Sequence, residues 1–132
     1  MTMDQSNAEE AILAQERHAL ERWSAGDPEG YVQSAAADMT YVDFIGAHLR
    51  LDGIQAVRDY LAGLKGAFPA HTYEVVDPRV QVYGDVGILT QHYYPTSLEG
   101  EAMGPSKATC VYRWIDGTWK MVHAHWSVIE QA

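Results

Sequence analysis

The amino-acid sequence predicts an α+β fold, with helices first and a long antiparallel sheet after them. Through residues 6–64, apolar side chains recur mostly at helical spacing, interrupted by two brief strand-like segments. From residue 72 onward the chain is rich in β-branched and aromatic residues, in four runs separated by turns. Helices that precede the strands, instead of alternating with them, are typical of the α+β class.

Three helices are predicted in the first half of the chain. An apolar face runs through residues 6–26 and ends on Gly26, a common helix stop. Asp27 and Pro28 suit the cap and the first position of a short second helix. A third helix is predicted at residues 53–64, where apolar side chains form a clear stripe.

The strands are predicted from residue type and turn signals. Two brief strands, MTYVDF and AHLRL, flank the turn-prone Gly46. Pro78 predicts a bulge or bend in the first long run, and Asp116-Gly117 predicts a tight hairpin. The four long runs are TYEVVDPRVQVYGD, VGILTQHYYPTS, KATCVYRWID and GTWKMVHAHWSVIE.

Length and composition favour one domain over residues 1–132, with a core at about 8–128. The 47% hydrophobic and 20% charged content is ordinary for a globular protein. A net charge of −9 argues against partners such as nucleic acid or an anionic membrane. The single cysteine, Cys110, excludes an internal disulfide and a cysteine-rich zinc site. No run has the length of a membrane span and no signal-peptide core is evident, so we expect a cytoplasmic protein.

Four segments, taken in order, resemble one superfamily. The chain resembles the nuclear transport factor 2-like or SnoaL-like superfamily, and most of all the association domain of calcium/calmodulin-dependent protein kinase II and its bacterial stand-alone relatives. This resemblance implies a cone-shaped, cystatin-like α+β barrel, in which N-terminal helices pack in a strongly bent antiparallel sheet around a cavity. The segments are AGDPEGYVQSAAADMTYVD, LDGIQAVRDYL, DPRVQVYGDVGILTQHYY and YRWIDGTWKMVHAHWS.

The resemblance also implies positions for functional residues. Relative to ketosteroid isomerase, Asp43 falls at the general base, whereas Ala19 and Cys110 replace the two oxyanion donors. Without those donors, the enolate of a steroid isomerisation would not be stabilised. Relative to the kinase association domain, Tyr94, Cys110 and Trp126 replace three pocket arginines. We therefore expect a cavity for a neutral, hydrophobic ligand.

Strand alternation predicts where the side chains of the last strand point. If Trp126 faces the cavity, then His123 and His125 face the opposite, convex side together with Trp119 and Met121. The resemblance implies that this side forms a homodimer interface. A metal site at the two histidines would need a further ligand, and a bulge could turn one histidine inward. We expect the interface role and no metal.

The candidate catalytic residues are Asp43, His92 and Tyr94. Asp43 would be the base, although an aspartate at this place can equally cap the turn near Gly46. His92 shares strand parity with Tyr94, so both are expected in the cavity as proton donors or orienting groups, or as hydrogen-bonded core residues. The expected ligand contacts come from Trp23, Tyr60, Cys110, Tyr112 and Trp126.

Two functional hypotheses follow. The first is a small-molecule-binding domain, either a binder alone or a cofactor-free acid–base enzyme that isomerises, dehydrates, cyclises or hydrates a hydrophobic substrate. The second is a non-catalytic association module that assembles through its convex sheet. No cofactor motif is found in the sequence.

Overall fold

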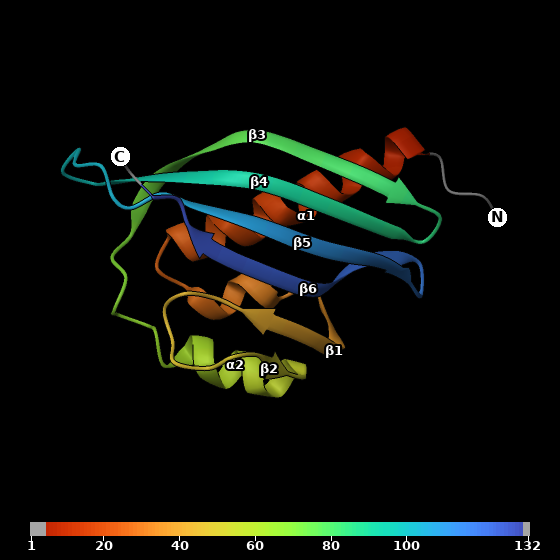
Figure 1. The fold of residues 1–132 in the computed structure, drawn as a ribbon, viewed down its shortest axis with the longest axis horizontal. Coiled ribbons are helices and arrows are strands. Elements are labelled where there is room, and N and C mark those ends of the chain that lie inside the picture. Colours follow the sequence, from red (N-terminus) through yellow and green to blue (C-terminus); the bar gives the residue numbers. More distant parts are fainter. Residues whose placement is uncertain (1–4, 131–132) are drawn as a thin grey trace.

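Helices and a curled sheet form two layers in the computed structural model, which describes residues 5–130, with side chains from residue 7 (Figure 1). The helical layer contains α1 (Gln5–Ser24), the short 3-10 helix η1 (Pro28–Val32) and α2 (Ile54–Ala62). These are the three helices that the sequence predicts. The strands are β1 (Ala35–Val42), β2 (Leu51–Asp52), β3 (His71–Tyr83), β4 (Val86–Ser97), β5 (Ser106–Ile115) and β6 (Thr118–Val128).

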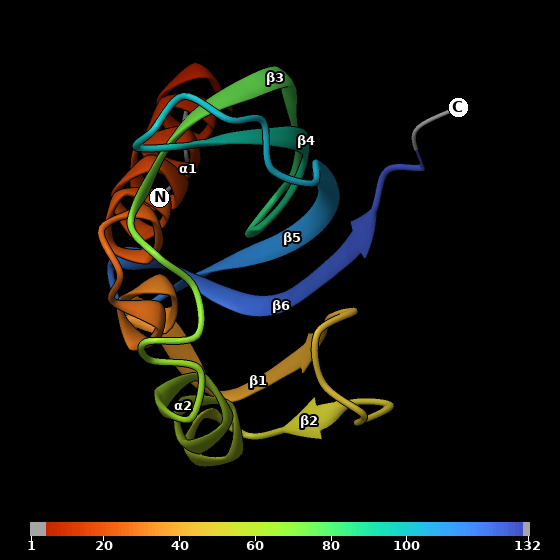
Figure 2. The same ribbon diagram turned by 90° about the vertical axis from the view of Figure 1, so that its left-hand side faces the viewer.

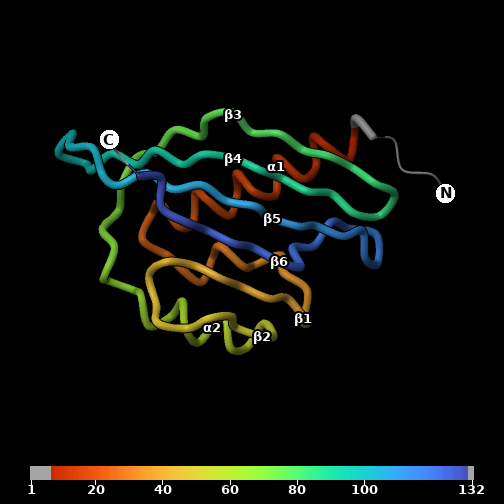
Figure 3. The backbone as a smooth tube through the Cα atoms, in the orientation of Figure 1, coloured from red at the N-terminus to blue at the C-terminus, as the bar shows by residue number. Residues whose placement is uncertain are grey.

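The six strands lie in the order β2-β1-β6-β5-β4-β3 (Figure 3). After β2 the chain passes through α2 to the opposite edge of the sheet and returns strand by strand, so that β6 ends beside β1. The β1–β6 pair is parallel, whereas the other pairs are antiparallel. The sheet is therefore mixed, which corrects the expectation of a purely antiparallel sheet. The α+β class itself is confirmed.

Local irregularities accompany the curl of the sheet, which wraps around α1 (Figure 2). The β3–β4 register shifts between Val76 and Arg79, and Asp77 has a positive φ of 54°, so the bulge expected from Pro78 is present. Asp116 and Gly117, with φ of 51° and 82°, form the expected hairpin turn. A second shift, opposite Val111 and Tyr112, makes Val122 an extra residue in β6.

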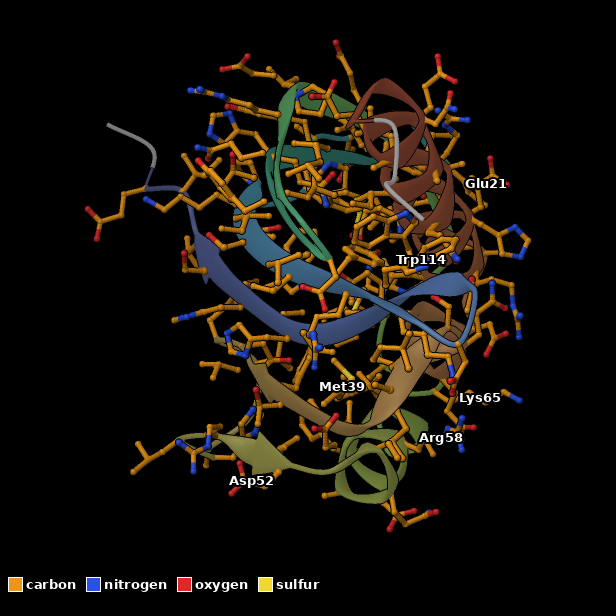
Figure 4. All side chains as sticks on the ribbon, turned by 90° about the vertical axis from the view of Figure 1, so that its right-hand side faces the viewer. Glu21, Met39, Asp52, Arg58, Lys65 and Trp114 are labelled. Atoms are coloured by element: carbon orange, nitrogen blue, oxygen red, sulfur yellow. The ribbon has the colours of Figure 1, made fainter. Side chains whose placement is uncertain are left out.

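The core fills the space between the helices and the concave face of the sheet. Ile12 of α1 packs so closely on Gly87 of β4 that there is no room for a side chain at residue 87. Met39 lies inside the molecule, while Glu21, Arg58 and Lys65 project from its periphery (Figure 4). Among the described residues, no helix combines the length and hydropathy of a membrane span.

Candidate ligand-binding site

A cavity of about 270 Å³ lies between the C-terminal part of α1, the segment after β1, and the ends of β3 to β6. Exposed Phe44 and Gly104 lie at its mouth. Aromatic and aliphatic side chains dominate the wall, with a few polar groups among them, which is the usual make-up of a small-molecule pocket. The lining residues are Leu20, Trp23, Tyr31, Tyr41, Asp43, Phe44, Ile45, Phe68, His71, Tyr93, Pro95, Met103, Gly104, Ser106 and Trp126.

Asp43 lies in the cavity wall directly after β1, and its side chain is only 1% exposed. Its Oδ1 accepts hydrogen bonds from the backbone N–H groups of Ile45 and Gly46, at 3.1 and 3.3 Å. The Tyr41 hydroxyl donates to Oδ2 at 3.1 Å, and the Tyr60 hydroxyl lies within 3.0 Å of both oxygens. Asp43 therefore caps the turn and also presents a carboxylate to the cavity, and its two oxygens accept hydrogen bonds from four donors.

His48 packs behind this carboxylate. Its Nε2 lies 3.5 Å from Asp43 Oδ1 and is buried without a hydrogen-bond partner. The imidazole also meets the Tyr60 ring edge-on, with ring centroids 4.6 Å apart. This close packing explains Gly46, because a side chain there would collide with both rings. Burial and the Asp43 charge both raise the pKa of the Tyr60 hydroxyl, so Tyr60 stays a proton donor to the carboxylate.

A histidine–tyrosine pair forms another polar part of the wall. His71 begins β3 and is buried, with Nδ1 2.9 Å from the Pro69 carbonyl oxygen and Nε2 2.6 Å from the Tyr93 hydroxyl. A carbonyl only accepts, so Nδ1 carries a proton, and in the neutral imidazole Nε2 accepts from Tyr93. Burial raises the pKa of the Tyr93 hydroxyl well above its usual range. Tyr73 stacks on Tyr93 and fixes its ring.

Glu16 of α1 lies beneath the cavity and is 1% exposed. Its carboxylate accepts hydrogen bonds from Tyr31 at 2.8 Å, Gln91 at 2.9 Å and Tyr112 at 2.6 Å. Burial raises the pKa of Glu16, and these hydrogen bonds oppose the shift. The Trp126 indole N–H donates to the Tyr31 hydroxyl at 3.1 Å, so the network reaches the cavity wall.

The structure divides the expected ligand contacts into two groups. Trp23 and Trp126 line the cavity. Tyr60 lies behind Asp43, and Cys110 and Tyr112 are buried beneath the wall beside Tyr31 and Glu16. These last three side chains can therefore influence a ligand only through the residues that they contact. Burial raises the pKa of the Cys110 thiol, which keeps it protonated.

The expected inward direction of His92 and Tyr94 is wrong. The side chains of β4 that face inward are those of Leu89, Gln91 and Tyr93, whereas Tyr94 is 40% exposed. His92 lines a shallow hollow on the outer face of the sheet. A shift of one residue exchanges the two faces of a strand, and both faces of β4 carry apolar and polar side chains, so the pattern did not decide between them.

The expected outward direction of Trp119 and Met121 is also wrong, since both are buried in the core. The extra residue Val122 reverses the alternation of β6 at its middle. After this bulge, His125 is exposed on the outer face, as predicted. His123 is half-buried and bonds through Nδ1 to the Thr40 hydroxyl at 2.8 Å. The described residues contain no cluster of three potential metal ligands.

Sequence reasoning missed Glu16, His71 and Tyr93. Glu16 carried a readable signal, because it lies four residues from both Ile12 and Leu20 and so shares their buried helix face. His71 and Tyr93 became identifiable only once the faces of β3 and β4 were known. A charged residue on an apolar helix stripe is the kind of exception that marks a buried polar network.

Solved structures with the same fold support these assignments of architecture. An NTF2-like protein of unknown function from Pseudomonas putida is 24% identical, with a TM-score of 0.85 over 96% of this chain and 90% of that one. A proposed ketosteroid isomerase from Parabacteroides distasonis is 26% identical, with a TM-score of 0.77 over 90% and 86%. The CamKII hub homology domain of Chlamydomonas reinhardtii is 20% identical, with a TM-score of 0.75 over 93% and 99%.

No curated protein sequence matches the chain significantly. A family model described as the SnoaL-like domain matches residues 14–131, which is most of the chain and includes every element that lines the cavity. The match and the fold agree, and the chain therefore belongs to the SnoaL-like domain family.

Proposed function

We propose that this domain binds a neutral, largely apolar small molecule in its cavity and transfers a proton to or from it. The observation that carries the proposal is the combination of an apolar, aromatic wall with a buried carboxylate and a buried histidine–tyrosine pair. Apolar walls supply affinity, and a few convergent polar groups supply orientation and chemistry. The assignment of proton-transfer residues changes accordingly: Asp43 stays, and His71 and Tyr93 take the places of His92 and Tyr94.

The charge of the wall disfavours anionic ligands. Among the described residues that line the cavity, none is lysine or arginine. A carboxylate ligand would face the Asp43 charge without a compensating cation, in a protein of net charge −9. A neutral ligand avoids this repulsion.

Asp43 is the proposed proton acceptor. Its carboxylate is desolvated and held in one orientation by the turn and by Tyr41 and Tyr60. When it takes a proton, one of these donors must yield, and the bifurcated bond from Tyr60 is the most easily changed. The reaction classes open to such a site without a cofactor are isomerisation, dehydration, cyclisation and hydration of a hydrophobic substrate.

Binding is tested with 2-naphthol, a planar neutral probe, by titration calorimetry. Gly104 lies at the cavity mouth, and a Cβ there meets nothing within 4 Å, so Gly104→Trp can fill the cavity without a backbone clash. We expect the wild type to bind and Gly104→Trp to lose at least about tenfold in affinity. Leu98→Trp, on an exposed loop residue, is the matched control and should bind as the wild type does. Equal binding by all three proteins would refute the cavity as the site.

Proton transfer is tested with 5-nitrobenzisoxazole. A base removes its C3 proton, the N–O bond breaks, and a coloured cyanophenolate forms, with no other reactant. We expect the wild type to accelerate this reaction above buffer and Asp43→Asn to lower the rate about a hundredfold. His92→Asn, on the outer face, is the control. An unchanged rate in Asp43→Asn would remove Asp43 from the proposed role.

Self-association through the outer face of the sheet is the second candidate. The helices lie on the inner side of the sheet (Figure 2). The exposed Tyr94 and the hollow around His125 belong to its outer face. The likeness in fold to a CamKII hub homology domain supports a homodimer or larger assembly. Thr109→Glu would place a charge in the middle of this face and should reduce the mass in light scattering to that of the monomer, whereas a mass already monomeric in the wild type would exclude the assembly.

A further inference from the structure

We propose that the cavity prefers ligands that bring a hydrogen-bond donor, a hydroxyl or amino group, over ligands whose only polar atom is a carbonyl oxygen. This inference rests on the proposed binding function and adds the chemical class of the ligand. It follows from a count of which polar side chains in the wall still have a proton to give.

The Tyr93 hydroxyl has no proton to donate to a ligand. Its hydroxyl proton is directed at His71 Nε2, 2.6 Å away. The Pro69 carbonyl fixes the tautomer by accepting from Nδ1 at 2.9 Å, so in the neutral imidazole Nε2 can only accept. The Tyr93 oxygen therefore offers lone pairs to the cavity and no proton.

The donors of the other buried polar side chains in the wall also already make hydrogen bonds within the protein. Tyr41 donates to Asp43, and the ionised Asp43 has no proton. Tyr31 donates to Glu16, and the Trp126 indole N–H donates to Tyr31. Each of these donors serves a partner inside the protein, and a ligand could take one only by breaking that bond.

Ser106 is the exception among the buried polar residues that line the cavity. It is 6% exposed and its hydroxyl makes no hydrogen bond within the described residues. A hydroxyl both donates and accepts, so Ser106 serves either kind of ligand. Trp23, which is only half-buried, keeps an indole N–H near the rim. The deep wall thus contains several acceptors and one free donor.

The excess of acceptors over free donors in the wall predicts that the cavity discriminates between ligands by their polar group. A ligand hydroxyl gains a hydrogen bond to the Tyr93 oxygen or the Asp43 carboxylate. A ketone oxygen placed there is repelled, because its negative partial charge lies against the lone pairs of these oxygens. Sites built to pair with a ligand hydroxyl reject analogues that lack it, because their own buried polar atoms are left unpaired.

The test compares three naphthalenes that carry one substituent at the same ring position, against one protein. They are 2-naphthol, which has a donor, 2-fluoronaphthalene, which has none, and 2-acetylnaphthalene, which has only an acceptor. Binding is followed by NMR through the indole N–H signal of Trp126, identified with Trp126→Phe. We expect 2-naphthol to bind about tenfold or more tighter than either analogue, because a factor of this size corresponds to the net contribution of one hydrogen bond.

Two tyrosine variants test whether the Tyr93 oxygen accepts the hydrogen bond from the ligand. Tyr93→Phe should lower the affinity for 2-naphthol and leave that for 2-fluoronaphthalene unchanged, so that the difference between the two ligands becomes smaller, with Asp43 as the remaining acceptor. Tyr94→Phe, the neighbour on the outer face, should change neither ligand. A merely structural role of Tyr93 would weaken both ligands equally, and that outcome refutes the inference.

The two proposals fail in different ways. If none of the three naphthalenes binds, the binding function is wrong. If all three bind to the cavity with similar affinity, or the ketone binds best, the binding function stands and the donor preference is refuted.

Discussion

Glu16 supplies a sharp test of the buried network beneath the cavity. Substitution Glu16→Ala would leave the hydroxyls of Tyr31 and Tyr112 and the amide of Gln91 without their acceptor. An unsatisfied buried donor costs about 1–3 kcal/mol, so the variant should lose at least about 3 kcal/mol of unfolding free energy. Glu16→Gln keeps a carbonyl oxygen for two of the three donors, and its amide can donate to the third hydroxyl once that hydroxyl rotates. We therefore expect a much smaller loss, about 1 kcal/mol.

The pH dependence of the unfolding free energy gives a second, independent test of the Glu16 network. Burial raises the pKa of Glu16 in the folded protein above its ordinary value of 4.5, so the protonated form favours folding. This contribution is fully present below pH 4.5 and is lost as the pH rises through the folded-state pKa. Glu16→Gln does not titrate. The stability of the wild type relative to Glu16→Gln should therefore fall with rising pH, by at most about 1.4 kcal/mol per pH unit.

Urea unfolding of both proteins, from about pH 5 to about pH 8, measures this difference directly. Other carboxylates titrate equally in the two proteins, so they cancel in the comparison. Parallel stability profiles would show that Glu16 does not change its protonation in this range. A Glu16→Ala variant as stable as the wild type would refute the network as a source of stability.

Other substitutions test the packing and the strand directions. Met121→Glu should unfold the domain, at a cost of about 3 kcal/mol or more for a buried unpaired charge. A variant that keeps the wild-type circular dichroism spectrum and melting temperature would contradict the core position of Met121. Gly87→Ala should cost about 1–3 kcal/mol through its clash with Ile12, and Ile12→Val should relieve part of that cost. A double-mutant cycle with no coupling would contradict this contact. Deleting Val122 should abolish the β6 bulge and lower the melting temperature, and an unchanged melting temperature would count against the bulge.

The fold could be predicted because helix stripes, turn residues and the order of segments all point to the same architecture. Asp116-Gly117 and Pro78 each produced the local geometry that their chemistry requires. The site was harder to predict, because it depends on which face each strand turns inward. In β4 both faces carry mixed side chains, and nothing in the sequence of β6 marks Val122 as an extra residue.

These two obstacles, the undecided faces of β4 and the bulge in β6, affected the predicted residues differently. The resemblance put Trp126 in the cavity, and alternation from Trp126 gave the right direction for His125, whereas Trp119 lies beyond the bulge and was reversed. Asp43 was found through the resemblance, which puts it at the position of the general base of ketosteroid isomerase. His71 and Tyr93 are joined across paired strands, and such a pairing is invisible until the register is known.

The cavity itself is tested most directly by intermolecular nuclear Overhauser effects between bound 2-naphthol and the protein. If the ligand occupies the cavity, its ring protons should show contacts to Phe68 and Trp126, which line it from two segments far apart in the sequence. Contacts confined to His92 and His125 on the outer face, or no contacts at all, would contradict a ligand-binding role for this cavity.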